Sequence, residues 1–132
     1  MRLSSIPNVE IYSPYCYEEL SFYIRNSAAS QYVTAIRYPR GCENKVDAEI
    51  DYSKDFTLFK GSSKKVIVTY GRLFTSAYKA KEISPEINIV KLNKIFPLSN
   101  ELIDLLCTFD TVHIFEEAIK CGGIGEHLSA LL

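Results

Sequence analysis

The sequence has no long apolar run, no excess of basic charge and no secretion signal at its start. A helix that spans a bilayer needs roughly 20 apolar residues in succession, and no stretch approaches this length. A net charge of -1 is unlike the basic surface that nucleic acids or acidic membranes attract. Residues 1–5 lack the apolar core of a signal peptide. We therefore expect a cytoplasmic protein without a membrane or nucleic-acid partner.

The sequence also lacks the closely spaced cysteine and histidine pairs that are typical of metal sites and of redox-active cysteines. The four cysteines show no Cys-x-x-Cys pattern: Cys16, Cys42, Cys107 and Cys121. In a chain of this size without a signal peptide, this indicates reduced thiols. His113 and His127 have no short ligand spacing to Cys121, so no metal site is predicted.

The composition is that of an ordinary globular protein that buries a core, with 47% hydrophobic and 23% charged residues. Residues 6–12 alternate in polarity like a strand. A helix follows to about Ala29, with Ser13 as its predicted cap and Pro14 at its first position. Its predicted buried stripe is Cys16, Leu20, Tyr23, Ile24 and Ser27. With a strand over residues 32–37, this predicts a parallel βαβ fragment that needs neighbours for stability.

The composition changes between residues 42 and 63, where acidic residues and lysines replace branched apolar ones. This segment is predicted to be a solvated linker that contains the boundary between two domains. Within it, residues 56–59 read as an edge strand that a tight turn at residues 60–63 joins to the next strand.

The remainder alternates strands and helices at short spacing. Strands are predicted at residues 66–70, 87–92 and 112–115. The predicted helices span residues 71–83, begin after Ser99, and follow the glycines near residue 124. Their expected buried residues are Leu73, Ala77 and Ala80 in the first, Leu102, Ile103, Leu105 and Leu106 in the second, and Leu128, Leu131 and Leu132 in the third. The predicted fold is α/β with three αβα layers, a mostly parallel sheet and one antiparallel edge strand.

Two arginines stand where the second predicted strand ends, in the string Arg37-Tyr38-Pro39-Arg40-Gly41. Two guanidinium groups beside a stiffened, tightly turned backbone suit the binding of a phosphate or carboxylate. Surface ion pairs at an interdomain hinge would give the same pattern, since arginines are common at strand ends. The spacing alone leaves both interpretations open.

Ligands of open parallel sheets bind beyond the carboxyl ends of the strands. Three loops are predicted to converge there: Gly71-Arg72, Asn93-Lys94, and Glu116-Glu117 with Gly122-Gly123-Ile124-Gly125. The glycine string has neither a following Lys-Ser/Thr pair nor a dinucleotide fingerprint, so we interpret it as a structural turn. The adjacent glutamates point to opposite faces and cannot form a catalytic pair, but one of them can pair with Arg72 or Lys94. No Gly-x-Ser-x-Gly elbow supports a catalytic triad.

Several of these strings resemble the C-terminal portion of 1-deoxy-D-xylulose-5-phosphate synthase. The resemblance rests on the following strings: Ile6-Pro7-Asn8-Val9, Ser13-Pro14 with Glu18-Glu19-Leu20, Arg37-Tyr38-Pro39-Arg40-Gly41, Tyr70-Gly71-Arg72, Phe96-Pro97-Leu98, and Glu116-Glu117 with the glycines. The resemblance implies a fragment of a pyrimidine-binding domain at 1–41, a linker at 42–63, and a transketolase C-terminal-like domain lacking its last strand at 64–132. In this family a thiamine-diphosphate enzyme joins pyruvate to glyceraldehyde 3-phosphate for isoprenoid, thiamine and pyridoxal synthesis.

The resemblance further implies that Arg40 clamps the substrate phosphate, with Arg37 and Tyr38 in support. It places Arg72, Glu116, Glu117, Gly122 and Gly123 in a loop or interface cluster. The family's thiamine diphosphate and magnesium sites lie in domains that the resemblance does not cover. We therefore expect this piece to bind no cofactor, to have no catalytic residue or synthase activity by itself, and to associate with itself, as a dimer, or with the missing domains.

Other interpretations stay open. One alternative is an interaction or dimerisation module of a split transketolase-like enzyme. Another is a β subunit of the 2-oxoacid dehydrogenase type, which the second arginine disfavours because only a phosphorylated acceptor needs it. The third is a nonfunctional remnant, which the well-patterned core disfavours. The string Ser13-Pro14-Tyr15-Cys16-Tyr17 and the arginine at position 72 depart from the family pattern, which bears on substrate specificity and not on the fold.

Overall fold

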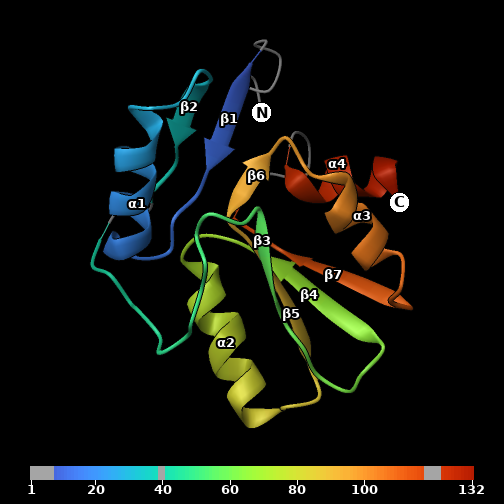
Figure 1. The fold of residues 1–132 in the computed structure, drawn as a ribbon. Helices are drawn as coiled ribbons and strands as arrows, with labels where there is room; N and C mark the ends of the chain where they lie inside the picture. The colour runs from blue at the N-terminus through green and yellow to red at the C-terminus, as the bar shows by residue number, and fades with distance from the viewer. Residues whose placement is uncertain (1–7, 39–40, 118–122) are drawn as a thin grey trace.

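The computed structural model describes residues 8–38, 41–117 and 123–132, which fold around two β-sheets (Figure 1). A four-stranded sheet has the order β3-β5-β4-β7, and a three-stranded sheet has the order β2-β1-β6. The strands are β1 (Val9–Tyr12), β2 (Val33–Ile36), β3 (Phe56–Phe59), β4 (Lys65–Thr69), β5 (Asn88–Leu92), β6 (Lys94–Phe96) and β7 (Thr111–Phe115). The helices are α1 (Tyr17–Ser27), α2 (Leu73–Ile83), α3 (Asn100–Leu106) and α4 (Ile124–Leu131).

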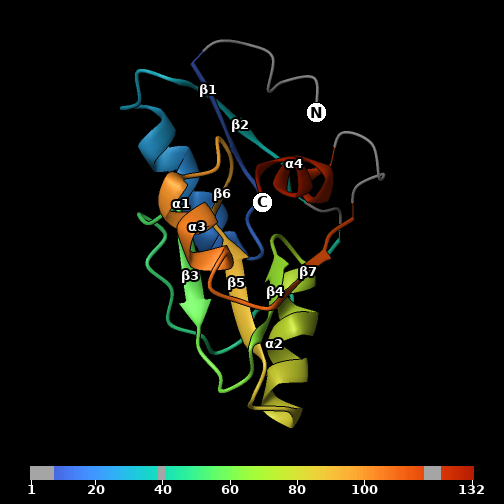
Figure 2. The same ribbon diagram turned by 90° about the vertical axis from the view of Figure 1, so that its right-hand side faces the viewer.

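The larger sheet confirms the predicted α/β class. Strand β4 pairs in parallel with β5 and with β7, and β3 is the antiparallel edge strand beside β5. Every residue of β5 is buried, as expected for a central strand covered on both faces. Leu102 of α3 and Leu128 of α4 pack with Val66 and Val68 on one face. Phe74 of α2 packs with Ile89 on the other face, which completes the three layers (Figure 2).

The smaller sheet contains the predicted βαβ fragment and one strand that the sequence did not indicate. Strand β1 pairs in parallel with β2, and α1 forms the crossover between them. On its other edge β1 pairs with the short antiparallel strand β6, where Ile11 lies opposite Phe96. The fragment thus obtains a neighbouring strand from the C-terminal half of the same chain. The predicted division at residues 1–41, 42–63 and 64–132 stays a prediction.

Helix α1 differs from its prediction in where it begins and in which face it buries. Its N-cap is Cys16 in an extended conformation, not Ser13. The predicted stripe is wrong at Ile24, whose side chain is 55% exposed, whereas Glu19 is fully buried. The carboxylate of Glu19 accepts a hydrogen bond from the backbone N–H of Tyr15 at 2.9 Å. A charged side chain therefore occupies the inward face, which no pattern of apolar residues predicts.

The other helices lie closer to the predictions made from the sequence, although some of their expected buried residues are exposed. The Ser99 hydroxyl caps α3 and accepts a hydrogen bond from the Leu102 N–H at 3.2 Å, as its position before the helix predicts. Helix α2 begins at Leu73 and buries Phe74, Thr75 and Ala77, so the prediction that Ala80 faces inward is wrong. At the end of α4, Leu128 is buried, but Leu131 and Leu132 are about half exposed.

Candidate functional site

A crevice of about 210 Å³ opens where four strands end at their carboxyl ends. Ser13 follows β1, Arg37 follows β2, Tyr70 follows β4, and Glu117 lies just beyond β7, and all four residues line the crevice. Open α/β sheets bind their ligands in this position. The predicted convergence of the loops at Arg72 and at Glu117 is therefore seen.

The third predicted loop does not line this crevice. Asn93 is fully buried, and Lys94 lies within 3.6 Å of Glu10 and 3.5 Å of Asp55 on another part of the surface. Strand β6, which begins at Lys94, turns the chain away from the end of β5 to pair with β1. The expectation that all three loops meet is wrong for this reason.

The crevice is bordered by an ion pair with two-pronged geometry. Arg72 donates from Nε to both carboxylate oxygens of Glu117, at 2.9 and 3.0 Å, and from Nη2 to Oε1 at 2.7 Å. Both side chains are about half exposed. The hydrogen bonds to the Glu117 carboxylate, followed by its negative charge, raise the pKa of Arg72. Because the charge of Arg72 is already balanced, this arginine closes one side of the crevice and offers little net charge to a ligand.

The neighbouring Glu116 caps the last helix. Its Oε1 accepts the Ile124 N–H at 3.1 Å, and its Oε2 accepts the Gly125 N–H at 2.7 Å. The anion at this helix N-terminus is thus a side chain of the chain itself. Gly123 is the N-cap in an extended conformation, and Gly122 lies outside the described residues. These contacts support the interpretation of the glycine string as a structural turn.

Tyr70 places a polar atom inside the crevice wall without a partner. Its ring belongs to the core beside Val66 and Val68, and the residue is 7% exposed. Among the described residues, its hydroxyl has no hydrogen-bond partner of good geometry. Burial raises the pKa of Tyr70, the carboxylate of Glu116 adds to this, and the guanidinium of Arg37 opposes it.

Of the arginine string at residues 37–41, the structure describes Arg37, Tyr38 and Gly41. The backbone N–H of Arg37 donates to the Tyr12 carbonyl at 2.8 Å and thereby extends the pairing of β2 with β1. Tyr38 is 67% exposed and also borders a second hollow of about 320 Å³ between the N-terminal ends of α1 and α2. Arg40, the predicted phosphate ligand, lies outside the described residues.

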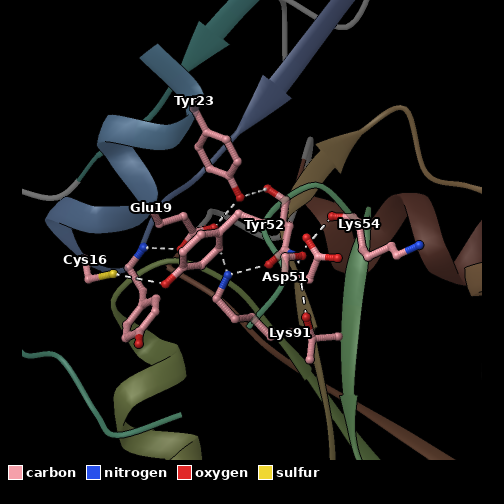
Figure 3. Close-up of polar contacts among 10 residues, drawn as sticks. Cys16, Glu19, Tyr23, Asp51, Tyr52, Lys54 and Lys91 are labelled. Carbon is pink, nitrogen blue, oxygen red and sulfur yellow. Dashed lines mark hydrogen bonds and ion pairs between the residues drawn. The ribbon is translucent and has the colours of Figure 1, made fainter. Parts of the chain in front are cut away.

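A buried polar network that no sequence pattern predicts joins α1 to β5 (Figure 3). The Lys91 ammonium lies 2.9 Å from Glu19 Oε2 and donates to Asn93 Oδ1 at 2.7 Å. Tyr23 donates its hydroxyl to the same carboxylate. Burial lowers the pKa of Lys91, and Glu19 opposes this shift. Burial, followed by the charge of Glu19, raises the pKa of Tyr23.

Aromatic rings complete the surroundings of the buried ammonium. The Lys91 Nζ lies 5.5, 5.8 and 5.7 Å from the ring centroids of Tyr15, Tyr52 and Phe74. These distances suit cation–π attraction. Lys91 and Glu19 are both completely buried, so the network fixes α1 against the sheet and presents no reactive group to a ligand.

Within residues 8–38, 41–117 and 123–132, no group of three or more His, Cys, Asp or Glu side chains is placed to hold a metal ion. In the same ranges, no helix combines the length and apolarity needed to cross a bilayer.

Comparison with known proteins gives curated relatives and structural neighbours that cover most of this chain. No protein-family model matches the chain. It is 34% identical to the 1-deoxy-D-xylulose-5-phosphate synthase of Clostridium botulinum strain Eklund 17B, over 98% of this chain and 23% of that enzyme. It is 32% identical to the synthase of Campylobacter hominis, over 98% of this chain and 23% of that enzyme. The chain thus spans less than a quarter of these relatives, and the resemblance seen in its motifs is confirmed.

Solved structures show the same fold. A chain from a structure described as a split-gene transketolase, inactive β4 tetramer, superposes with a TM-score of 0.75 at 19% identity, over 96% of this chain and 45% of that one. A transketolase from Pichia stipitis superposes with a TM-score of 0.68 at 18% identity, over 92% of this chain and 20% of that one. The predicted transketolase C-terminal-like fold is confirmed.

Proposed function

We propose that this chain is the C-terminal part of a thiamine-diphosphate-dependent transferase of the 1-deoxy-D-xylulose-5-phosphate synthase type. The observation that carries the proposal is the similarity of nearly the whole chain to one part of these synthases. Arg37 and Tyr38, the first two residues of the arginine string, follow β2 and line the crevice. The reaction would join pyruvate to glyceraldehyde 3-phosphate with loss of carbon dioxide, in the cytoplasm, and supply isoprenoid, thiamine and pyridoxal synthesis.

In this proposal the chain contributes recognition of the acceptor substrate. Arg40 follows a strand whose end is fixed by the hydrogen bond between Arg37 and Tyr12. A guanidinium fork matches the oxygens of a phosphate in geometry and charge, which a hydroxylated sugar without phosphate would not use. Arg37 and Tyr38 support Arg40 from the same segment.

The cofactor belongs, in this proposal, to domains other than those described here. Thiamine diphosphate, when bound with magnesium, supplies the carbanion chemistry of such enzymes. The described residues bring together no carboxylate cluster for the metal. Our proposal gives them the tasks of binding and orienting the phosphorylated substrate, and it gives the isolated chain no synthase activity.

The test is a fusion in which this chain replaces the matching segment of the Clostridium botulinum synthase. We expect the fusion to form deoxyxylulose phosphate. In the fusion, Arg40→Ala should lower kcat/KM for glyceraldehyde 3-phosphate by about tenfold or more and leave the KM for pyruvate nearly unchanged. Arg25→Ala, in the last turn of α1, is the matched control. Equal losses in both variants would count against a phosphate role for Arg40.

The purified chain alone provides the complementary measurement. With thiamine diphosphate, magnesium and both substrates, it should form no product. Detectable deoxyxylulose phosphate would overturn the assignment of the cofactor to other domains.

A second candidate is an interaction module of a split transketolase-like enzyme, which the similarity to a split-gene transketolase favours. In that case the chain should form a complex of defined stoichiometry with the remainder of the Clostridium botulinum synthase, measured by light scattering during gel filtration. Self-association of the chain without any complex would favour a dimerisation role.

A further inference from the structure

We propose that a pocket between α1, β1 and the loop before β3 binds a small alkylammonium ion. Four aromatic rings and two carboxylates line this α1–β1 pocket: Tyr12, Phe22, Tyr23, Tyr52, Glu10 and Asp55. Its volume is about 210 Å³. One water occupies roughly 30 Å³ in the liquid, so the pocket has room for an ammonium group with a short alkyl chain. The inference does not rest on the proposed function.

The first argument is the aromatic wall of the α1–β1 pocket. The ring centroid of Tyr23 lies 4.4 Å from that of Tyr12 and 6.5 Å from that of Tyr52. The Phe22 centroid lies 6.0 Å from those of both Tyr23 and Tyr52. The four rings therefore form one continuous surface. Aromatic rings attract cations through the partial negative charge of their faces and alkyl groups through apolar contact, so this wall suits both ends of an alkylammonium ion.

The second argument is the negative charge at one side of the pocket. Among the described residues, the carboxylates of Glu10 and Asp55 share one ion-pair partner, Lys94, whose Nζ lies 3.6 Å from the first and 3.5 Å from the second. Both distances exceed the roughly 2.7–2.9 Å of a close charge-assisted hydrogen bond. After burial, the same two carboxylates raise the pKa of Tyr12 to about 12, and a hydrogen bond to Glu10 adds to this. The partly exposed carboxylate of Asp55 is therefore the acceptor that a cationic ligand can reach.

One other cation borders the pocket. Lys54 is among its lining residues and competes there with a positively charged ligand. In Figure 3 the Lys54 side chain extends away from Tyr23 and Tyr52, and the residue is exposed. The space in front of the rings is therefore left to another ammonium group.

The third argument is that the pocket is fixed before a ligand arrives. The Asp55 carbonyl accepts the backbone N–H groups of Asn93 and Lys94 at 2.9 and 3.0 Å, which holds this residue beside β6. The Tyr23 hydroxyl donates to the buried carboxylate of Glu19, so the orientation of its ring is set from inside the protein (Figure 3). A ligand would have few side chains to order, which lowers the entropic cost of binding.

The direct test is an NMR titration of the isotope-labelled full chain with n-butylammonium chloride. Two matched controls accompany it: n-butanol, which has the same alkyl chain without the charge, and sodium chloride, which supplies the same ionic strength. We expect butylammonium alone to cause saturable shifts in the signals of Phe22, Tyr52 and Asp55.

Four variants separate the contributions of charge and of the rings. Asp55→Asn should weaken butylammonium binding by about threefold or more, because it removes a partly exposed charge. Phe22→Leu should weaken it by about as much, because it removes a ring from the wall. Asp104→Asn, the same change at an exposed position of α3, should bind as the unchanged chain does. Lys54→Ala should bind at least as tightly, because a competing positive charge is gone.

Each other outcome overturns the proposal. Absence of saturable shifts at high millimolar butylammonium excludes the site. Equal shifts with n-butanol would show an apolar pocket that does not select a cation. Equal shifts with sodium chloride would show only the screening of surface charges. Binding that both Asp55→Asn and Phe22→Leu leave unchanged, in variants whose amide spectra remain folded, would place the ligand elsewhere on the protein.

Discussion

Glu19 and Lys91 stand 72 residues apart in the sequence, yet their charged atoms lie 2.9 Å apart with both side chains completely buried. Two ions lose their hydration in the interior, and their mutual attraction together with added hydrogen bonds has to offset that loss. The carboxylate also accepts the Tyr15 N–H and the Tyr23 hydroxyl, and the ammonium donates to Asn93. Both members of the pair therefore have hydrogen bonds beyond the one that joins them, and together they specify how α1 sits on β5.

Removing one member of this pair should strongly destabilise the fold. We expect Lys91→Met to lower the free energy of unfolding by about 3–5 kcal/mol, because it leaves the Glu19 carboxylate buried without its counter-ion. Urea denaturation followed by circular dichroism measures this change. The variant Glu19→Gln/Lys91→Met, with no buried charge, should regain a large part of the loss. A double variant that loses the sum of both single effects would show that the two side chains are not coupled.

The fold should lose stability at alkaline pH through Tyr12. Burial, followed by the nearby carboxylates of Glu10 and Asp55, raises the pKa of Tyr12 from 10.0 to about 12. The unfolded chain therefore releases this proton at lower pH than the folded chain. The resulting stabilisation is complete below pH 10 and disappears as the pH rises to about 12. Urea midpoints across this interval should fall less steeply for Tyr12→Phe than for the unchanged chain.

The cap that Glu116 provides should be measurable at the start of α4. Glu116→Gln keeps one acceptor oxygen where the carboxylate has two, so one of the bonds to Ile124 N–H and Gly125 N–H is lost. We expect a destabilisation of about 1 kcal/mol and faster amide exchange in the first turn of α4. Glu82→Gln, an exposed change in α2, is the control. Unchanged exchange in α4 would contradict the capping role.

Gly71 should tolerate no side chain. Gly71→Ala combines a left-handed φ of +63° with a Cβ only 2.9 Å from Ser13 Oγ. We expect a loss of about 1–3 kcal/mol from the backbone conformation alone, and a further loss from the contact. Gly41→Ala separates the two effects, because Gly41 has a φ of +104° and open space around its added Cβ. Equal destabilisation of both variants would mean that the approach to Ser13 is unimportant.

The ion pair of Arg72 with Glu117 should behave as an exposed contact. Arg72→Ala should leave the urea midpoint nearly unchanged, because about half of each side chain is in water and long side chains lose freedom when they pair. A clear fall in the urea midpoint would contradict the view of this pair as an exposed contact that contributes little to stability.

Local signals in the sequence were enough for most of the larger sheet. The β-branched run of β4, the edge strand β3 and the cap at Ser99 each depend on residues close in the chain. The Gly71-Arg72 and Glu116-Glu117 loops could be placed at one end of the sheet because parallel strands share their carboxyl edge. The part of the candidate site formed by Arg72 and Glu117 follows from that rule.

Distant partners explain what the sequence did not reveal. Strand β6 is three residues long, and it becomes a strand because β1 has an open edge beside it. A glutamate early in a helix, such as Glu19, is expected to face solvent. It is buried here because Lys91 of β5, 72 residues away, supplies its counter-ion. The surroundings of the Tyr70 hydroxyl could not be predicted either, because the sequence pattern around a tyrosine after a buried strand does not indicate its hydrogen-bond partners.

The pairing of β1 with β6 also has a consequence for the order in which this polypeptide assembles. Strand β1 cannot form its pairing with β6 until residues 94–96 have left the ribosome. The loop between two such distant segments has to close before their contacts yield any stabilisation, and proteins rich in such contacts fold slowly. During synthesis, the edge of β1 that pairs with β6 should therefore stay unpaired until residue 96 has emerged.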